Sequence, residues 1–470
     1  MSRVRTRGGL WGRPATRRRT MGAALSAAAL LPAGCGPLGA LGGSRPGGAG
    51  ADAVPGPSKG PVTLRYAHGW STLYLDRLDK VVVDFNAKHS HITAEHHRLP
   101  DNSKLHEELS TALAAGAPPD VSMQWRGAMP AFAAKGALLA LDGFIKRDRF
   151  DASIYYENEF RSSQFAGKVW VLPAAASGAW YLIFYNRDHF RDAGLDEHKP
   201  PTTWDEAVRF AGVLNRRAGD GKIERLGFEP ALRDASLFNS PFAAWLATNG
   251  GTFASQDGRT LRFDSPQGAA ALEWMQRVLQ QVGGREAFDE FFARAKGGTE
   301  SFPIGLRSMY LTNHSFPARL KQVAPDLRYG IGTLPRGTGS GATGIVRGGW
   351  SNGIPAGVPA PHESWLLVQH LSATREAAGW FMREQVRPSP IKAVNESPVY
   401  DDLPHWDAIK GALASDTLVA QTPVDVELDT LTAAAVTEVY QGTSAPREAL
   451  AFAQREGQRR LDEFWSGIKP

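Results

Sequence analysis

The hydrophobic and polar positions of this chain alternate between the period of a strand and that of a helix along most of its length. Residues 62–68 (VTLRYAH), 91–99 (HITAEHHRL) and 120–125 (DVSMQW) are β-rich and predict strands. Residues 75–89 and 103–115, which lie between them, predict amphipathic helices. This alternating order is typical of an α/β fold with a mainly parallel sheet.

Two later helices have clear start signals. Thr203 and Glu206 predict a capping box at the start of one, and Ser265 precedes the other as its cap. The remaining elements are predicted from pattern alone. They are a turn and strand over 256–264 (QDGRTLRFD), a strand-loop-strand over 345–357 (IVRGGWSNGIPAG), and helices over 363–382 and 446–465.

Residues 1–34 predict an export signal peptide, because Arg17, Arg18 and Arg19 precede a short apolar stretch. That stretch, residues 22–33, is too short to span a bilayer core, which needs about 20 residues. The string TRRRTM resembles a twin-arginine signal, and the choice of export route stays open. The string LLPAGC resembles a lipobox, which implies lipidation of Cys35. Ordinary cleavage of the signal peptide is the alternative.

Residues 35–60 predict a flexible tether, since nine of these 26 residues are glycine and four are proline.

The charge and the cysteine content of the chain argue against two further classes of protein. Seven of the 53 basic residues lie in residues 1–34, so the remainder holds 46 basic and 48 acidic residues. A basic nucleic-acid-binding body is therefore disfavoured. Cys35 is the only cysteine, which excludes an internal disulfide and a multi-cysteine metal site.

Several strings from residue 62 onwards occur together, in the same order as in a known protein family. The most specific is residues 167–214, GKVWVLPAAASGAWYLIFYNRDHFRDAGLDEHKPPTTWDEAVRFAGVL. Others are AAGAPPDVSMQW, KGALLALDGFI, NGGTFASQDGRTLRFDSPQGAAAL, YGIGTLP, GGWSNGIPAG and TSAPREAL. Together they resemble the extracellular solute-binding proteins of family 1, the maltose-binding-like capture subunits of ABC sugar importers.

The resemblance implies a type-2 periplasmic-binding fold, in which two α/β lobes are joined by hinge strands. It places lobe 1 at 61–174 and 340–388, and lobe 2 at 175–339 and 389–470. The chain is then expected to cross between the lobes near 172–181, 335–344 and 385–395.

The implied function is capture of a sugar or oligosaccharide between the lobes and its delivery to an ABC transporter permease. We expect no catalysed reaction, no cofactor, no resident metal and no nucleic-acid partner. The resemblance and the leader together imply an exported monomer. It would be anchored by its lipid at the outer face of the cytoplasmic membrane, or be periplasmic.

Sugars need flat aromatic rings for their C–H faces and polar side chains for their hydroxyl groups. Ligands of open α/β sheets bind beyond the carboxyl ends of strands. Four tryptophans fall in loops there, and a place in the core is the alternative for each: Trp70, Trp125, Trp180 and Trp350. The polar candidates match contact loops of the family: His68, Ser71, Gln124, Arg126, Asn249, Tyr310, Asn313, Asn395 and Glu396.

Two rival functions remain open. His89, His91, His96 and His97 are clustered as in some metal sites, which makes a metal-binding capture protein one rival. However, His96 and His97 point to opposite faces of the predicted strand, which favours solvated histidines. An exported carbohydrate-active enzyme is the other rival. Pairs of carboxylates for such an enzyme exist, but nothing in the sequence places two of them across a cleft.

A serine nucleophile is also disfavoured. The string GWSNG places Ser351 in a G-x-S-x-G pattern, but that pattern needs a helix directly after the serine. The residues that follow here, Ile-Pro-Ala-Gly, oppose a helix.

Overall fold

The computed structural model describes residues 54–99, 104–231, 241–295, 299–337 and 341–468. The predicted signal peptide, Cys35 and residues 35–53 of the predicted tether lie outside these residues. Within the described ranges, no helix combines the length and apolar character that a membrane crossing requires. Strands and helices alternate as predicted, and the α/β class is confirmed.

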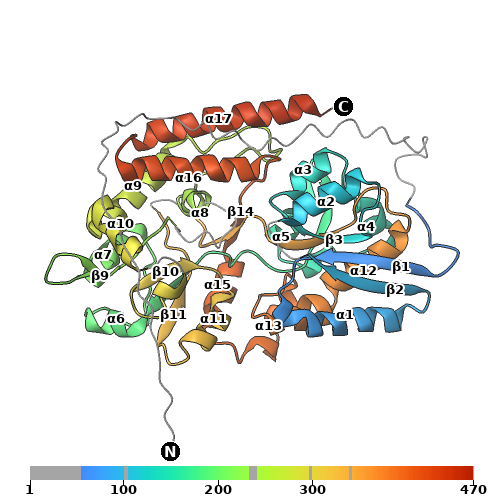
Figure 1. Ribbon diagram of the computed structural model, residues 1–470, viewed down its shortest axis with the longest axis horizontal. Helices are drawn as coiled ribbons and strands as arrows, with labels where there is room; N and C mark the ends of the chain where they lie inside the picture. Colours follow the sequence, from blue (N-terminus) through green and yellow to red (C-terminus); the bar gives the residue numbers. More distant parts are fainter. Residues whose placement is uncertain (1–53, 100–103, 232–240, 296–298, 338–340, 469–470) are drawn as a thin grey trace, which may run out of the picture. The chain divides into compact units, whose positions relative to one another are not determined.

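A five-stranded sheet is built on the first three strands of the chain (Figure 1). β1 (Val62–His68) lies between β2 (Ile92–Arg98) and β3 (Val121–Trp125) and is parallel to both. β13 (Trp350–Gly353) then pairs antiparallel with β3, and β6 (Val171–Pro173) pairs antiparallel with β13. All five residues of β3 are buried, as expected for a central strand.

Helices cover this sheet with their apolar stripes. α1 buries Leu78, Val81, Val82 and Phe85, and it packs along β2 (Figure 1). The helices of this part of the chain are α1 (Leu75–Lys88), α2 (Leu105–Ala114), α3 (Met129–Ala134), α4 (Asp142–Asp148), α5 (Glu157–Arg161) and α12 (Pro361–Ala373), with short 3-10 turns η1 (Thr72–Tyr74) and η3 (Ala152–Ile154). A hairpin of β4 (Gln164–Phe165) and β5 (Lys168–Val169) precedes β6.

A three-stranded sheet forms a second centre. β7 (Leu182–Asn186) lies between β10 (Met309–Thr312) and β11 (Tyr329–Gly332) and is antiparallel to both. Its helices and remaining strands come from the middle of the chain. They are α6 (Arg187–Asp192), α7 (Trp204–Leu214), β8 (Arg216–Arg217), β9 (Ile223–Arg225), α8 (Phe242–Thr248), α9 (Pro266–Gln281), α10 (Gly284–Arg294), η4 (Thr299–Ser301) and α11 (Phe316–Val323).

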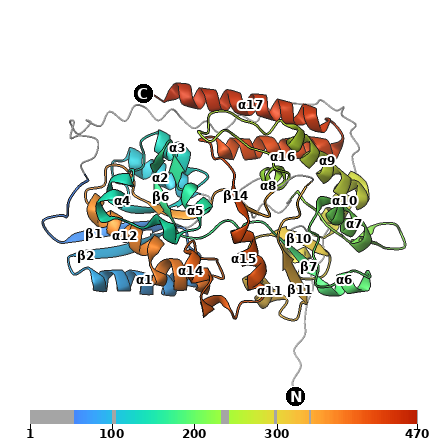
Figure 2. The same ribbon diagram turned by 180° about the vertical axis from the view of Figure 1, so that it is seen from behind.

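The last third of the chain contributes elements to both parts of the fold. β12 (Gly344–Val346) pairs in parallel with β14 (Asp416–Leu418). α16 (Asp425–Gln441) and α17 (Pro446–Gly467) run side by side in both views and pack on α9 (Figure 1, Figure 2). The other elements are η5 (a π-helix, Arg375–Phe381), α13 (Met382–Glu384), α14 (Lys392–Asn395), η6 (Pro398–Tyr400) and α15 (Trp406–Ala414).

The local sequence signals were reliable where they were strongest. Thr203 and Glu206 form the predicted capping box, and Ser265 accepts a hydrogen bond from the backbone N–H of Gly268. Two predictions are wrong. Residues 256–264 contain one isolated bridge, at Leu261, and no strand. The helix predicted over 363–382 ends at Ala373, and a π-helix follows it.

The described end of the predicted tether is held against the body. Ser58 donates from its backbone N–H and its hydroxyl to the carboxylate of Glu363, at 2.7 and 3.0 Å. The carbonyl of Pro55 accepts a hydrogen bond from Arg147. Residues 54–60 are thus bound to the sheet-covering helices, so the flexible tether expected over 35–60 does not extend to its last residues.

Candidate ligand-binding site

One edge of the five-stranded sheet is joined to one edge of the three-stranded sheet by a single connecting segment. His68 and Trp125 end parallel strands, and Trp350 pairs with Trp125 at the start of β13, so all three lie at one edge. In the other sheet, the start of β7 at Leu182 pairs with Thr312 at the end of β10. The chain leaves the first edge at Pro173 and enters the second at Leu182. Residues 174–181 therefore join the two edges where open α/β sheets bind ligands.

The four predicted tryptophans lie together at this junction. The ring centroids of Trp125 and Trp180 are 5.3 Å apart, those of Trp125 and Trp350 are 5.1 Å apart, and those of Trp70 and Trp350 are 6.5 Å apart. Each side chain is at most 6% exposed. We expected rings with faces open to a ligand, whereas in this structure the rings cover one another.

Several buried polar atoms of the junction have no hydrogen-bond partner among the described residues, and three of them lie on residues of or beside the connecting segment's second half and the third crossing. These three are Nε1 of Trp180, Nε2 of His314 and Nε of Arg387. The rings of Trp180 and His314 are 5.9 Å apart, edge to face, and the charge of Arg387 acts on His314. Unpaired buried polar groups are uncommon in proteins, so each of these atoms is available to a further hydrogen-bond partner.

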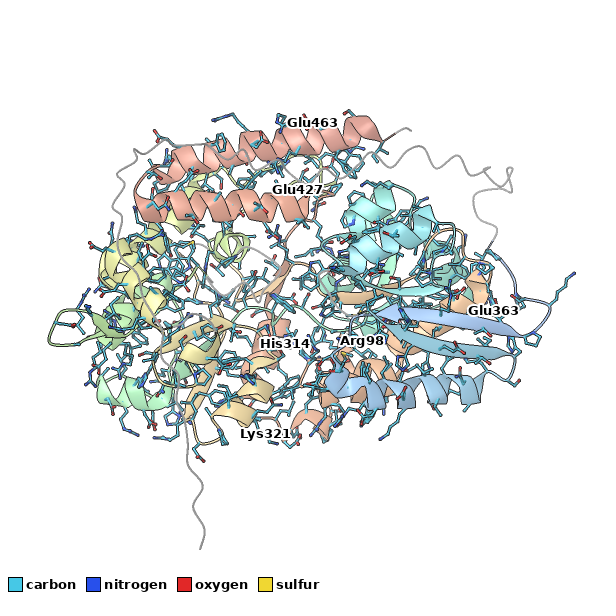
Figure 3. The ribbon with its side chains drawn as sticks, in the orientation of Figure 1. Arg98, His314, Lys321, Glu363, Glu427 and Glu463 are labelled. Carbon is cyan, nitrogen blue, oxygen red and sulfur yellow. The ribbon has the colours of Figure 1, made fainter. Side chains whose placement is uncertain are left out.

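His314 is held in one tautomer. It follows β10, is fully buried, and is labelled in Figure 3. Its Nδ1 lies 3.3 Å from the carbonyl oxygen of Ala179, which only accepts, so Nδ1 carries the proton. Burial, and then the charge of Arg387, lower the pKa of His314 to about 3. At neutral pH its Nε2 is therefore an acceptor.

Arg126, predicted as a ligand contact, is instead committed to the protein. Its guanidinium donates to the carbonyls of Gly348 and Trp350, at 2.9 and 3.2 Å, and forms an ion pair with Glu159 at 2.5 Å. Both partners of this pair are 0% exposed. Glu159 also accepts from the backbone N–H groups of Ser177 and Gly178. The pair thus fixes the connecting segment to the first sheet.

A second carboxylate lies under the same segment. Asp416, the first residue of β14, accepts a hydrogen bond from Asn158 at 2.8 Å. Burial raises the pKa of Asp416 to about 7, the bond from Asn158 lowers it, and the negative Glu159 raises it. A methyl group at Gly178 would lie 2.3 Å from Oδ2 of Asp416, so this close approach requires glycine.

The other predicted polar residues have local partners. Asn395 bonds to both backbone groups of Ser389, at 2.8 and 2.7 Å, and Tyr310 packs against Phe302 and Phe316. The remaining contacts are Asn249 to the carbonyl of Gln267, Asn313 to Ser315, Ser71 to the N–H of Leu73, and Gln124 to Ser122, while Glu396 is exposed. The structure brings the tryptophans together and leaves these polar side chains in separate local networks.

The histidine cluster is also tied to its surroundings. His68 accepts from the N–H of Trp70 and lies 3.0 Å from His96, which lies 2.7 Å from Asp79. Burial, together with the charges of His96 and Arg98, lowers the pKa of His68 to about 3. No group of three or more His, Cys, Asp or Glu residues suited to a metal occurs in the described ranges. Ser351 lies within β13 and is not followed by a helix.

Two surface cavities have other linings. One, of about 380 Å³, lies beside β1, β2 and α2 and includes Arg65, Glu95, His97 and Glu108. The other, of about 200 Å³, includes Ala218, Glu224, Phe291, Arg294 and Leu306. Neither is lined by the four tryptophans.

Sequence analysis missed His314, Arg387 and Glu159. His314 directly follows the predicted Asn313, and Arg387 lies in the predicted third crossing, so both were within reach of the family pattern. Glu159 gave no local signal, because its partner Arg126 is 33 positions away.

Comparison with known proteins identifies the protein family of this chain. Residues 72–378 match the family model described as bacterial extracellular solute-binding protein. A binding protein of Brucella abortus is 27% identical over 274 residues, and the sn-glycerol-3-phosphate-binding periplasmic protein UgpB of Salmonella typhimurium is 26% identical over 315 residues. These alignments cover 57% and 61% of this chain. The chain spans only 61% and 66% of the length of these two curated relatives.

Solved structures agree on the fold. The cyclic α-maltosyl-1,6-maltose binding protein of Arthrobacter globiformis matches with a TM-score of 0.71 at 19% identity, over 86% of this chain and all of that one. The sugar-binding protein MalE of Xanthomonas citri matches with a TM-score of 0.69 at 19% identity, over 86% and 97%. A mannotriose-bound protein, CpMnBP1, matches with a TM-score of 0.68 at 22% identity, over 84% and 99%. The chain has the predicted type-2 periplasmic-binding fold and belongs to the bacterial extracellular solute-binding protein family.

Proposed function

We propose that this protein captures a sugar or oligosaccharide at the junction of its two sheets and delivers it to an ABC transporter permease. The observation that carries the proposal is the gathering of four indole rings and of polar atoms without hydrogen-bond partners around residues 174–181. Indoles bind the C–H faces of sugars, and polar atoms without partners pair with their hydroxyl groups. The sugar-binding descriptions of the solved relatives support the same class of ligand.

Ligand entry requires a change at the junction. Because Trp125 and Trp180 cover each other, a sugar reaches their faces only when the two rings separate. Separation moves the first sheet relative to the second about the crossing segments. A ligand that touches both edges then favours the closed state, which the permease can distinguish from the empty one.

The lobe boundaries that the resemblance implies are part of the proposal. We retain 61–174 with 340–388 as lobe 1, and 175–339 with 389–470 as lobe 2. The five-stranded sheet takes its strands from 62–173 and 350–353, and the three-stranded sheet takes its strands from 182–332, which supports this division.

The location and the assembly complete the proposal. The protein is exported, lipidated at Cys35 and held at the outer face of the cytoplasmic membrane, where it acts as a monomer without catalysing a reaction. The basic, then apolar, leader and the Gly/Pro-rich tether support this location.

Titration calorimetry of the purified protein tests the function. Mannotriose, maltotriose and zinc are the probes, and Trp180→Leu is compared with Trp380→Leu, which removes a half-buried indole outside the junction. We expect an oligosaccharide to bind, and Trp180→Leu to weaken it roughly tenfold or more, with Trp380→Leu unchanged. Binding of zinc without any carbohydrate, or equal effects of the two variants, would refute the proposal.

A further inference from the structure

Side chains of the first two strands hold Trp70 in place. The backbone N–H of Trp70 donates to Nδ1 of His68 at 3.1 Å, and its indole N–H donates to the hydroxyl of Tyr66 at 3.1 Å. Its carbonyl oxygen accepts from Nε of Arg98, labelled in Figure 3, at 3.0 Å. All three of these partners are side chains of β1 or β2. The position of this buried indole in the tryptophan cluster therefore depends on how those side chains are arranged.

His68 is the inner end of a chain of hydrogen bonds that reaches the surface. Its Nε2 lies 3.0 Å from Nδ1 of His96, and Nε2 of His96 lies 2.7 Å from a carboxylate oxygen of Asp79 in α1. His68 is fully buried, whereas the side chains of His96 and Asp79 are 17% and 63% exposed. Solvent protons therefore reach this chain at His96.

The partners at the two ends give the chain of hydrogen bonds one direction. The backbone N–H of Trp70 only donates, so Nδ1 of His68 is unprotonated and its Nε2 carries the proton. That N–H donates to Nδ1 of His96, so the proton of neutral His96 is on Nε2 and is donated to Asp79. Burial, together with the charges of His96 and Arg98, lowers the pKa of His68 to about 3, so His68 is neutral near pH 7.

A second proton on His96 is incompatible with this direction. Protonated His96 carries an N–H at Nδ1, which then faces the N–H of His68 Nε2. His68 accepts from it only if its own proton moves to Nδ1, where that proton faces the N–H of Trp70. Proton uptake by His96 therefore breaks either the bond between the two histidines or the bond that holds Trp70.

The titratable and charged groups that face His96 act in opposite directions. Its strand packs against β1 and α1. The carboxylate of Asp79, from α1, favours the protonated imidazole, whereas the N–H of His68, from β1, disfavours it. The other groups nearby are Tyr66 of β1, which pairs with His96 across the strands, and Arg98 and His97 on β2 itself. His96 is the member that combines contact with solvent and the bond to His68.

We propose that His68, His96 and Asp79 are positioning residues for the indole of Trp70, and that they make sugar binding depend on the protonation of His96. Neutral His96 keeps Trp70 in place for the ligand, and protonated His96 releases it, so affinity falls as the pH falls. His68, predicted as a ligand contact, acts on the ligand through Trp70. This inference rests on the proposed capture function and adds a regulation of the same site.

Calorimetry of the purified protein with mannotriose and maltotriose, between about pH 5.5 and 8, tests the proton dependence. We expect affinity to fall roughly three- to tenfold towards the acid end, the equivalent of one hydrogen bond. His96→Gln should give a flat profile, because its amide oxygen accepts from His68 but takes up no proton. His96→Leu should bind weakly at every pH, because the N–H of His68 loses its acceptor. His91→Gln removes an exposed histidine just before β2 and should keep the slope of the parent.

Nuclear magnetic resonance of the protein with 15N-labelled histidine and tryptophan reads the arrangement without a ligand. Neutral His68 should carry its proton on Nε2, and the amide and indole signals of Trp70 should shift with the same midpoint as the ring of His96. His96→Gln and Trp70→Phe assign these signals. Asp79→Asn should lower the midpoint by less than about one pH unit, because an exposed carboxylate that favours the protonated ring is lost.

The outcomes separate this inference from the proposed function. Sugar binding that is equally tight across the pH range would overturn the inference and leave capture standing, as would a slope that persists in His96→Gln. A proton on Nδ1 of neutral His68, or Trp70 signals that do not follow His96, would overturn it whether or not a sugar binds. If His96→Leu does not fold, His96→Gln and the titration of the parent decide. No binding of either sugar at any pH would contradict the capture function, and the resonance titration then decides whether His96 positions Trp70.

Discussion

Replacing Glu159 by Gln should destabilise the protein far more than the loss of one exposed carboxylate. The substitution keeps the shape of the side chain and its acceptor oxygen for the N–H groups of Ser177 and Gly178. It removes the charge that balances Arg126, which is 0% exposed. Breaking a buried ion pair by removing one partner costs about 3–5 kcal/mol, because the other charge stays buried.

Urea unfolding, followed by circular dichroism and tryptophan fluorescence, measures this cost. Glu157→Gln is the control, since Glu157 is two residues earlier, 85% exposed and only 3.9 Å from Arg161. Exposed pairs of this kind contribute about 0–1 kcal/mol. The two probes together show whether one lobe or both unfold early.

A double variant separates the pair from its surroundings. Arg126→Met with Glu159→Gln removes both charges, so we expect it to be less destabilised than the sum of the two single variants by about 1–3 kcal/mol. If Glu159→Gln unfolds within about 1 kcal/mol of Glu157→Gln, the pair does not carry the connecting segment, and the reasoning fails.

Two further predictions concern the same framework. Burial raises the pKa of Asp425 to about 7, with Arg347 opposing the shift. Its contribution to stability is therefore present at low pH and is lost as the pH rises towards 7, so between pH 5 and 8 Asp425→Asn should gain up to about 3 kcal/mol over the parent. Urea unfolding should show no such trend for the exposed Glu427→Gln. Gly349→Ala should cost about 2–4 kcal/mol, because φ is +107° and the methyl would lie 2.2 Å from Nη2 of Arg126. At Gly357, with φ +80° and open space, the same change should cost only about 1–2 kcal/mol, and thermal melts that rank the two equally would contradict the packing argument.

The sequence predicted those elements whose signals are local. The capping box of α7 and the cap of α9 are formed by residues three positions apart, so tertiary contacts did not need to be known. The strand over 256–264 failed because distant side chains took its place. The N–H groups of Leu261 and Asp264 donate to Gln458 and Gln454 of α17 instead of to a neighbouring strand.

Helix α16 was not predicted, because its formation depends on tertiary packing. Its sequence contains several valines and threonines, whose β-branched side chains lower helix propensity, and no helix was predicted there. The helix forms because its buried side chains pack on α17 and α9, a tertiary contact that its own sequence does not reveal. Propensity alone therefore understated the C-terminal part of the fold.

For the site, residue type and position predicted a meeting place but not the role of each side chain. Trp70, Trp125 and Trp350 converge because they follow, end or begin strands at one edge, which strand order determines, and the connecting segment brings Trp180 to them. Their mutual burial depends on how closely the edges approach, and no local pattern encodes that distance. The ligand role of each of the four rings stays a prediction.

Arg126 and Arg387 differ in the partners of their side chains. Both are arginines near the crossing segment, and sequence analysis chose Arg126 because it matches a contact loop of the family. What separates them is a carboxylate elsewhere in the chain: Glu159 neutralises Arg126, whereas no described carboxylate reaches Arg387. Arg126 therefore holds the crossing in place through a partner that no local pattern around it reveals.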